Sequence, residues 1–205
     1  AGFQGVVFAL SNVVIQSSIN LFGATVVAGN SAAANIEGFV YVAMNAFHQT
    51  AISFISQNFG AGNEKRINRC AIWAEVCVTV VGIVLGNACV IFGRPLLSIY
   101  SGSSAVIDAG MQRLRVIART YALCGIMDVM VGALRGVGYS VMPMIVSLIG
   151  ACGLRLLWLA TVFQIEQYHT VHIVYLSYPI TWIIALSVLV ICFVLIRRKQ
   201  IKKIA

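Results

Sequence analysis

The chain has 205 residues, of which 60% are hydrophobic and 10% charged, and its mean hydropathy is +0.93. Soluble globular chains are about 45–50% apolar and about 25% charged, so this composition excludes soluble, disordered and nucleic-acid-binding proteins. The net charge of +8 therefore needs an explanation within a membrane protein. The six cysteines lie in or beside apolar stretches and form no Cys-x-x-Cys or Cys/His spacing, which indicates small buried side chains.

Six apolar segments are long enough to cross a membrane. A spanning helix needs about 20 mostly apolar residues, at about 1.5 Å each, to cross about 30 Å of hydrocarbon. The segments are residues 3–22, 28–57, 67–92, 109–135, 139–163 and 172–196. The second is longer than a bilayer requires and is expected to tilt or to extend beyond the headgroups. The sequence predicts an all-α membrane protein, because the unbroken apolar run at 188–196 does not alternate as a β-barrel strand would.

Lysine and arginine concentrate in the loop 60–69 and in the tail 197–205. Short cytoplasmic loops retain basic residues, so we expect this loop and this basic tail to lie in the cytoplasm. The expected location is the bacterial inner (plasma) membrane, with multiple passes and no nucleic-acid partner. The sequence begins at Ala1, directly in apolar residues and without a methionine, which predicts that part of the protein lies upstream.

Polar side chains recur at intervals of about four residues in the first two predicted helices. In segment 3–22 they are Gln4, Asn12, Gln16 and Asn20, and in segment 28–57 they are Glu37, Tyr41, Asn45 and Gln49, with His48 beside them. Residues four apart lie on one face of a helix. Because a polar group in a membrane needs a partner or water, we interpret the two stripes as the lining of a shared substrate or ion cavity. Hydrogen bonding between packed helices is the alternative.

Ionisable residues inside the predicted spans are candidates for transport or coupling, since charges in hydrocarbon are costly. The candidates selected are Glu37, Glu75, Arg119, Asp128 and Arg155. Asp128 lies about two turns before Arg135 at the cytoplasmic end, within the membrane core, where a carboxylate can bind Na⁺ or exchange a proton. It is therefore the leading ion-coupling candidate.

Three of the other intramembrane charges are expected to form ion pairs. Glu37 and Arg155 both fall in the half of the membrane away from the tail, which makes them a candidate structural pair. Glu75 is near the cytoplasmic start of its helix and is expected to pair with loop lysines or arginines. No metal site is expected beyond possible Na⁺ at Asp128, because His169 and His172 have no carboxylate cluster nearby.

Four motifs carry a family resemblance. They are AANIE at 33–37, QNFGAGN at 57–63, LRGVGYSVMP at 134–143 and SYPITW at 177–182. In this combination and order the chain resembles the MATE (multidrug and toxic compound extrusion) transporters. The motifs are spread over most of the chain, and it is their combination that makes the resemblance specific.

The resemblance implies the second, C-terminal lobe of a two-lobed transporter, with residues 1–205 corresponding to helices seven to twelve. Its partners would be the lipid bilayer, drug-like organic cations, and a first six-helix lobe in the same polypeptide or a second copy. It implies export of organic cations and amphipathic compounds by alternating access, with Na⁺ or H⁺ as the coupling ion and no other cofactor. Asp128 matches an acid that the sodium-coupled branch carries on helix ten. The segment corresponding to helix seven has Asn12, Gln16 and Asn20 and no carboxylate.

Other functions stay open. A related lipid-linked oligosaccharide flippase would need cationic cavity residues for phosphate, and Arg119 and Arg155 are candidates for that role. In a scaffold or assembly partner without transport activity, the polar stripes would pair between helices. An enzyme is not expected, because the sequence has no G-x-S-x-G elbow and His48 has no evident nucleophilic serine partner.

Overall fold

The computed structural model describes the backbone of residues 2–204 and the side chains of residues 9–200. Residues 2–204 form helices and connecting loops without a β-strand, which confirms the all-α prediction. The side chains of Gln4 and of the tail beyond residue 200 lie outside the described residues.

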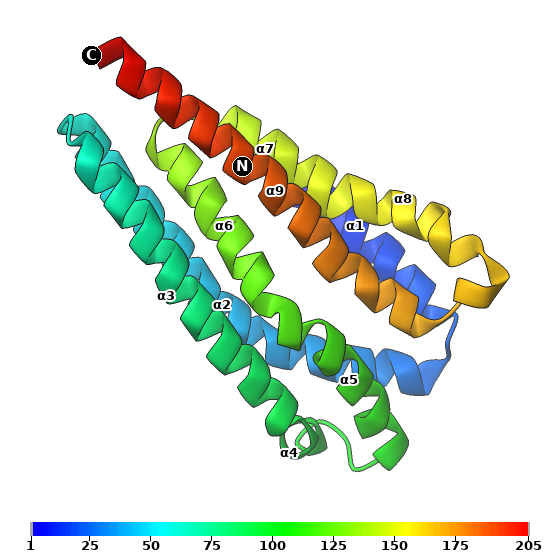
Figure 1. Ribbon diagram of the computed structural model, residues 1–205. Coiled ribbons are helices and arrows are strands. Elements are labelled where there is room, and N and C mark those ends of the chain that lie inside the picture. The colour runs from blue at the N-terminus through cyan, green and yellow to red at the C-terminus, as the bar shows by residue number, and fades with distance from the viewer. Residues whose placement is uncertain (1, 205) are drawn as a thin grey trace.

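Helices cover all six predicted segments (Figure 1). They are α1 (Gly2–Asn20), α2 (Ala24–Gly60), α3 (Glu64–Ile91), α4 (Gly93–Ser98), α5 (Ser104–Val116), α6 (Tyr121–Gly136), α7 (Val141–Ser147), α8 (Leu154–Ala160) and α9 (Val171–Ile204). A 3₁₀ turn, η1 (Ala118–Thr120), joins α5 to α6, and a π-helical turn, η2 (Leu148–Gly153), joins α7 to α8. Two further 3₁₀ turns, η3 (Val162–Gln164) and η4 (Glu166–Tyr168), lead to α9. The short helix α4 was not predicted, because six residues between two long apolar segments give no periodic signal.

Among the described residues, four helical rods are long and apolar enough to cross a membrane. They are Glu64–Ile91, Ser104–Gly136, Val141–Gln164 and Val171–Gln200. The helices α1 and α2, which carry the two polar stripes, do not meet this criterion. The first residues of α1 also lie outside the described side chains. Membrane crossing by α1 and α2 therefore stays a prediction.

The helix α6 lies in the middle of the bundle. It packs against α2 and α3 on one side and against α9 on the other (Figure 1). One core cluster joins α2, α3 and α6 and includes Met44 and Val78, while a second joins α1, α6 and α9 and includes Ile15 and Leu189. Both faces of α6 are thus buried, which places the residues of α6 at the centre of the fold.

Glycines on α6 bring its backbone close to α2. A Cβ at Gly132 would lie 2.8 Å from the backbone oxygen of His48, and a Cβ at Gly136 would lie 2.7 Å from Ile55. A Cβ at Gly125 would lie 2.5 Å from the sulfur of Met44. Small residues at a helix contact allow this approach, and here they occur along the length of α6.

The turn from α2 to α3 explains the QNFGAGN motif. Gly62 has a φ of +66°, in the left-handed region that favours glycine. The next residue, Asn63, caps α3, since its Oδ1 accepts a hydrogen bond from the backbone N–H of Arg66 at 3.3 Å. This three-residue connection makes α2 and α3 antiparallel neighbours.

Arg197 connects the end of α9 to the start of α3. Its guanidinium forms an ion pair with Glu64 and donates from Nε to Asn68 Oδ1 at 3.0 Å. The side chain is buried despite its place in the basic tail. The loop 60–69 and the end of α9 therefore meet at one end of the bundle, as Figure 1 also shows. That this end faces the cytoplasm stays a prediction.

Candidate functional site

A buried ion pair joins α2 to α5. Arg113 donates from Nη2 to Glu37 Oε2 at 2.7 Å and from Nε to Oε2 and Oε1 at 3.1 and 3.2 Å. The two side chains are only 9% and 4% exposed. Charges removed from water need partners and further hydrogen bonds, and this bidentate geometry supplies both.

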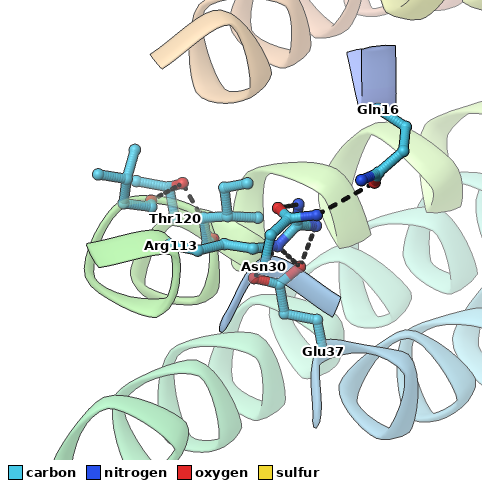
Figure 2. A network of polar contacts seen from close by, with 7 residues as sticks. Gln16, Asn30, Glu37, Arg113 and Thr120 are labelled. Atoms are coloured by element: carbon cyan, nitrogen blue, oxygen red, sulfur yellow. Dashed lines mark hydrogen bonds and ion pairs between the residues drawn. The ribbon is translucent and has the colours of Figure 1, made fainter. Parts of the chain in front are cut away.

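The ion pair belongs to a longer polar network (Figure 2). Arg113 Nη1 donates to Asn30 Oδ1 at 2.8 Å, and Asn30 Nδ2 donates to Gln16 Oε1 at 3.3 Å. Gln16 Nε2 in turn donates to Asn20 Oδ1 at 3.0 Å. The network thus runs from the buried face of α5, across α2, to the exposed Asn20 at the end of α1. It links three helices through polar groups.

The predicted pair of Glu37 and Arg155 is wrong, because Glu37 pairs with Arg113 instead. The helix α5 approaches α2 closely, since a Cβ at Gly29 would lie 2.6 Å from the backbone nitrogen of Gly110. That approach places Arg113, one turn beyond Gly110, beside Glu37. Arg113 lies inside the predicted fourth span, 109–135, but sequence reasoning did not select it as a partner for Glu37.

Arg155 instead packs against α9. Its guanidinium carbon lies 3.8 Å from the ring centroid of Tyr178, and its Nη2 donates to Thr181 Oγ1 at 3.3 Å. The same Tyr178 ring lies 5.5 Å from the guanidinium carbon of Arg113, so both arginines flank one aromatic side chain. Arg155 is 6% exposed, and its Nε has no hydrogen-bond partner within the described part of the chain. A cation over a tyrosine face is stabilised by the ring quadrupole, which compensates partly for burial.

Only part of the two predicted stripes enters the network. Gln16, Asn20 and Glu37 belong to it, together with Asn30 and Arg113, which sequence reasoning did not select. The remaining stripe residues are outside it: Asn12, Tyr41 and Gln49 are exposed, and Asn45 is half-buried. The signal that could have found Asn30 is its position seven residues, or two turns, before Glu37. A cavity shared by both stripes stays a prediction.

Asp128 is half-buried on α6, near the contact with α2. The backbone oxygen of Asp128 lies 2.5 Å from Nδ1 of the buried His48, which forms a polar contact between the two helices. The carboxylate of Asp128 interacts electrostatically with Arg135, almost two turns further along α6. Asp128 thus lies in the rod Ser104–Gly136, which is the most buried of the four apolar rods. It is not part of the hydrogen-bonded network around Glu37. Within the described residues no group of three or more His, Cys, Asp or Glu side chains could hold a metal ion.

The two other predicted intramembrane charges lie apart from these residues. Arg119 is exposed in η1. Glu75 was expected to pair with a basic loop residue, and that expectation is wrong, because both carboxylate oxygens are buried without a hydrogen-bond partner in the described part of the chain. The buried cation near this loop is Arg197, and it forms its ion pair with Glu64.

A helical bundle with four membrane-length apolar rods has the build of a multi-pass membrane protein. The family model MatE matches residues 1–160. The chain therefore belongs to the MatE family, as the motifs in its sequence predicted.

Curated relatives are similar to this chain over most of its length. The probable multidrug resistance protein YpnP of Bacillus subtilis is 28% identical over 155 residues, which is 76% of this chain and 35% of that protein. The FAD transporter of Shewanella oneidensis is 24% identical, and the match covers 78% of this chain and 34% of that protein. The probable multidrug resistance protein NorM of Thermotoga maritima is 22% identical, covering 72% of this chain. The chain spans about a third of the length of these relatives.

Solved structures share the fold. The Vibrio cholerae MATE transporter VcmN in its bent form has a TM-score of 0.84 at 18% identity, covering 97% of this chain and 44% of its own. A MOP superfamily transporter from Pyrococcus furiosus has a TM-score of 0.81 at 13% identity, and the match covers 91% of this chain and 41% of that transporter. At these identities the likeness concerns the fold alone, and it matches this chain to a part of each transporter.

Proposed function

We propose that this chain is the second lobe of a multidrug efflux transporter, which exports organic cations and amphipathic compounds by alternating access in exchange for Na⁺ or H⁺. Membership of the MatE family and similarity to two probable multidrug resistance proteins support this function. The coverage of about a third of each relative supports a partner lobe elsewhere in the protein. The location would be the bacterial inner membrane, with the basic end of the bundle in the cytoplasm.

The observation that carries the proposal is the position of Asp128 inside the most buried apolar rod, beside the contact between α6 and α2. A coupling ion drives transport only if its affinity differs between the inward-open and outward-open states. A carboxylate at a contact between two helices meets that requirement when the contact differs between the states. Amide oxygens such as that of Gln16 are ligands suited to Na⁺, but the Gln16 side chain is on a separate network.

The proposal is tested by gradient-driven efflux of a cationic dye from cells or vesicles that contain the full-length protein. Asp128→Asn should abolish efflux, because an amide neither exchanges a proton nor supplies a negative charge. Asp108→Asn is the matched control, since Asp108 is exposed and pairs with the exposed Arg94. Efflux by Asp128→Asn at the rate of the control would refute the coupling role. Collapsing the Na⁺ and H⁺ gradients separately identifies the ion.

One observation favours a second candidate, transport of an anionic or phosphate-bearing amphipathic compound. Arg155 is buried and contacts Tyr178 and Thr181, but has no carboxylate partner among the described residues. A relative is an FAD transporter, and a lipid-linked oligosaccharide flippase would need the same kind of cation. The two candidates differ in one measurement. Uptake into inverted vesicles that prefers anionic to cationic compounds, and that Arg155→Gln abolishes, would replace the first proposal with the second.

A further inference from the structure

A pocket of about 490 Å³ lies between α3, α6 and α9, and neither Asp128 nor the residues of the Glu37 network line it. Its walls are mainly apolar, and its lining includes Ile72, Glu75, Val76, Met130, Phe193 and Arg198. Small-molecule sites usually occupy about 300–1,000 Å³ and combine apolar walls with a few polar groups. In Figure 1 the three helices run side by side toward the end of the bundle that holds the C terminus.

Glu75 is the unexplained polar group of this pocket. Both of its carboxylate oxygens are buried and have no hydrogen-bond partner in the part of the chain that is described. Arg197 also lines the pocket, but it is committed to Glu64, Asn68 and Gln200. A buried carboxylate is costly unless a positive charge or a proton accompanies it, so Glu75 is available to a ligand with positive charge.

The pocket opens onto the surface of the bundle. Ile72 is 61% exposed and Val76 is 45% exposed, and both lie on α3 at the pocket wall. Glu75 lies seven residues beyond Asn68 on α3, which is about 10 Å deeper along the helix axis. A ligand thus meets apolar side chains first and reaches the carboxylate at depth.

We propose that this pocket is a second binding site, which takes hydrophobic organic cations with their charge against Glu75 and their apolar part between α3 and α9. An anionic phospholipid would suit Arg198 at the rim, but it would leave the Glu75 carboxylate without a partner. The observations therefore favour a cation. The inference rests on the proposed function only for its ligand class, because the site itself is defined by the pocket and the unpaired carboxylate.

The test is equilibrium dialysis of radiolabelled tetraphenylphosphonium against the full-length protein in detergent. Two variants address the pocket: Glu75→Gln removes the charge at constant shape, and Val76→Trp fills the space from an exposed position. Ile83→Trp is the matched control, because Ile83 is also exposed on α3 but does not line the pocket. Melting in detergent establishes that each variant is folded.

We expect both pocket variants to lose one bound equivalent, or at least tenfold in affinity for it, while Ile83→Trp and Asp128→Asn retain it. Equal stoichiometry and affinity in all variants would overturn the inference. So would an anionic phospholipid that copurifies with the protein and is lost only from Val76→Trp. Because binding is measured without a gradient, loss of efflux in Asp128→Asn and loss of this binding in Glu75→Gln are independent results.

Discussion

The buried pair of Glu37 and Arg113 allows a quantitative test of the packing between α2 and α5. Arg113→Met removes the guanidinium while keeping a long apolar side chain that fills part of the same volume. The substitution leaves the Glu37 carboxylate without its three contacts at 2.7–3.2 Å, and it also leaves Asn30 Oδ1 without its donor at 2.8 Å. Glu37→Gln is the reciprocal change and leaves Arg113 charged in the same buried place.

The expected loss is large because both side chains are almost inaccessible. At 9% and 4% exposure, neither group can regain hydration without local unfolding. Removing one member of a buried ion pair typically costs about 3–5 kcal/mol. The exposed pair of Arg94 and Asp108 is the internal comparison, since its side chains are 61% and 55% exposed. Breaking an exposed pair costs about 0–1 kcal/mol, so Arg94→Met should be nearly neutral.

The assay is thermal or denaturant unfolding of the full-length protein in detergent. The variants are Arg113→Met, Glu37→Gln, the double variant with Glu37→Met and Arg113→Met, and Arg94→Met. If the pair is formed as described, Glu37→Met combined with Arg113→Met should be more stable than Arg113→Met alone, because no charge is left unpaired. Charge reversal at both positions should likewise recover part of the loss. A result in which Arg113→Met and Arg94→Met are equally stable would refute the reasoning about burial.

Two further predictions concern the packing of α6 and α9. Gly132→Val should destabilise the protein by about 1–3 kcal/mol, since its Cβ would meet the backbone of His48 at 2.8 Å, and unfolding in detergent measures this. Gly38→Ala is the control, because nothing lies within 4 Å of its Cβ and alanine favours a helix; a destabilised control would count against the packing explanation. Arg197→Ala should loosen the end of α9 and speed amide exchange there and at the start of α3, because it removes the contacts with Glu64 and Asn68. Exchange that changes equally in α1 would contradict this local role.

The sequence predicted the helical class and the family because these depend on strong, local signals. Long apolar segments set the helices, and motifs such as QNFGAGN are legible without a structure, since Gly62 and Asn63 perform their turn and cap roles within a few residues. The partners of buried charges depend on which helices pack together, and that is not local. Glu37 was assigned to Arg155 by membrane depth alone, whereas glycines at 29 and 110 bring α5 and Arg113 to it.

The same reasoning explains why Glu75 was misjudged. The short distance in sequence between Glu75 and a basic loop predicted an ion pair. The cation in this region is instead Arg197, near the end of α9, and it pairs with Glu64 at the start of α3. One carboxylate of α3 is thereby neutralised and the other, three turns deeper, is left unpaired. A pairing of this kind depends on the register between α3 and α9, which no short segment of sequence specifies.

The position of α6 gives the coupling proposal a structural basis. The helix is buried on both faces, and its glycines set a short distance to α2 where His48 contacts the backbone of Asp128. Closely packed contacts of this type do not deform gradually, so under the coupling proposal a change of charge at Asp128 would favour one discrete packing over another. The Glu37 and Arg113 pair joins α2 to α5, which is the other half of the rod that contains α6.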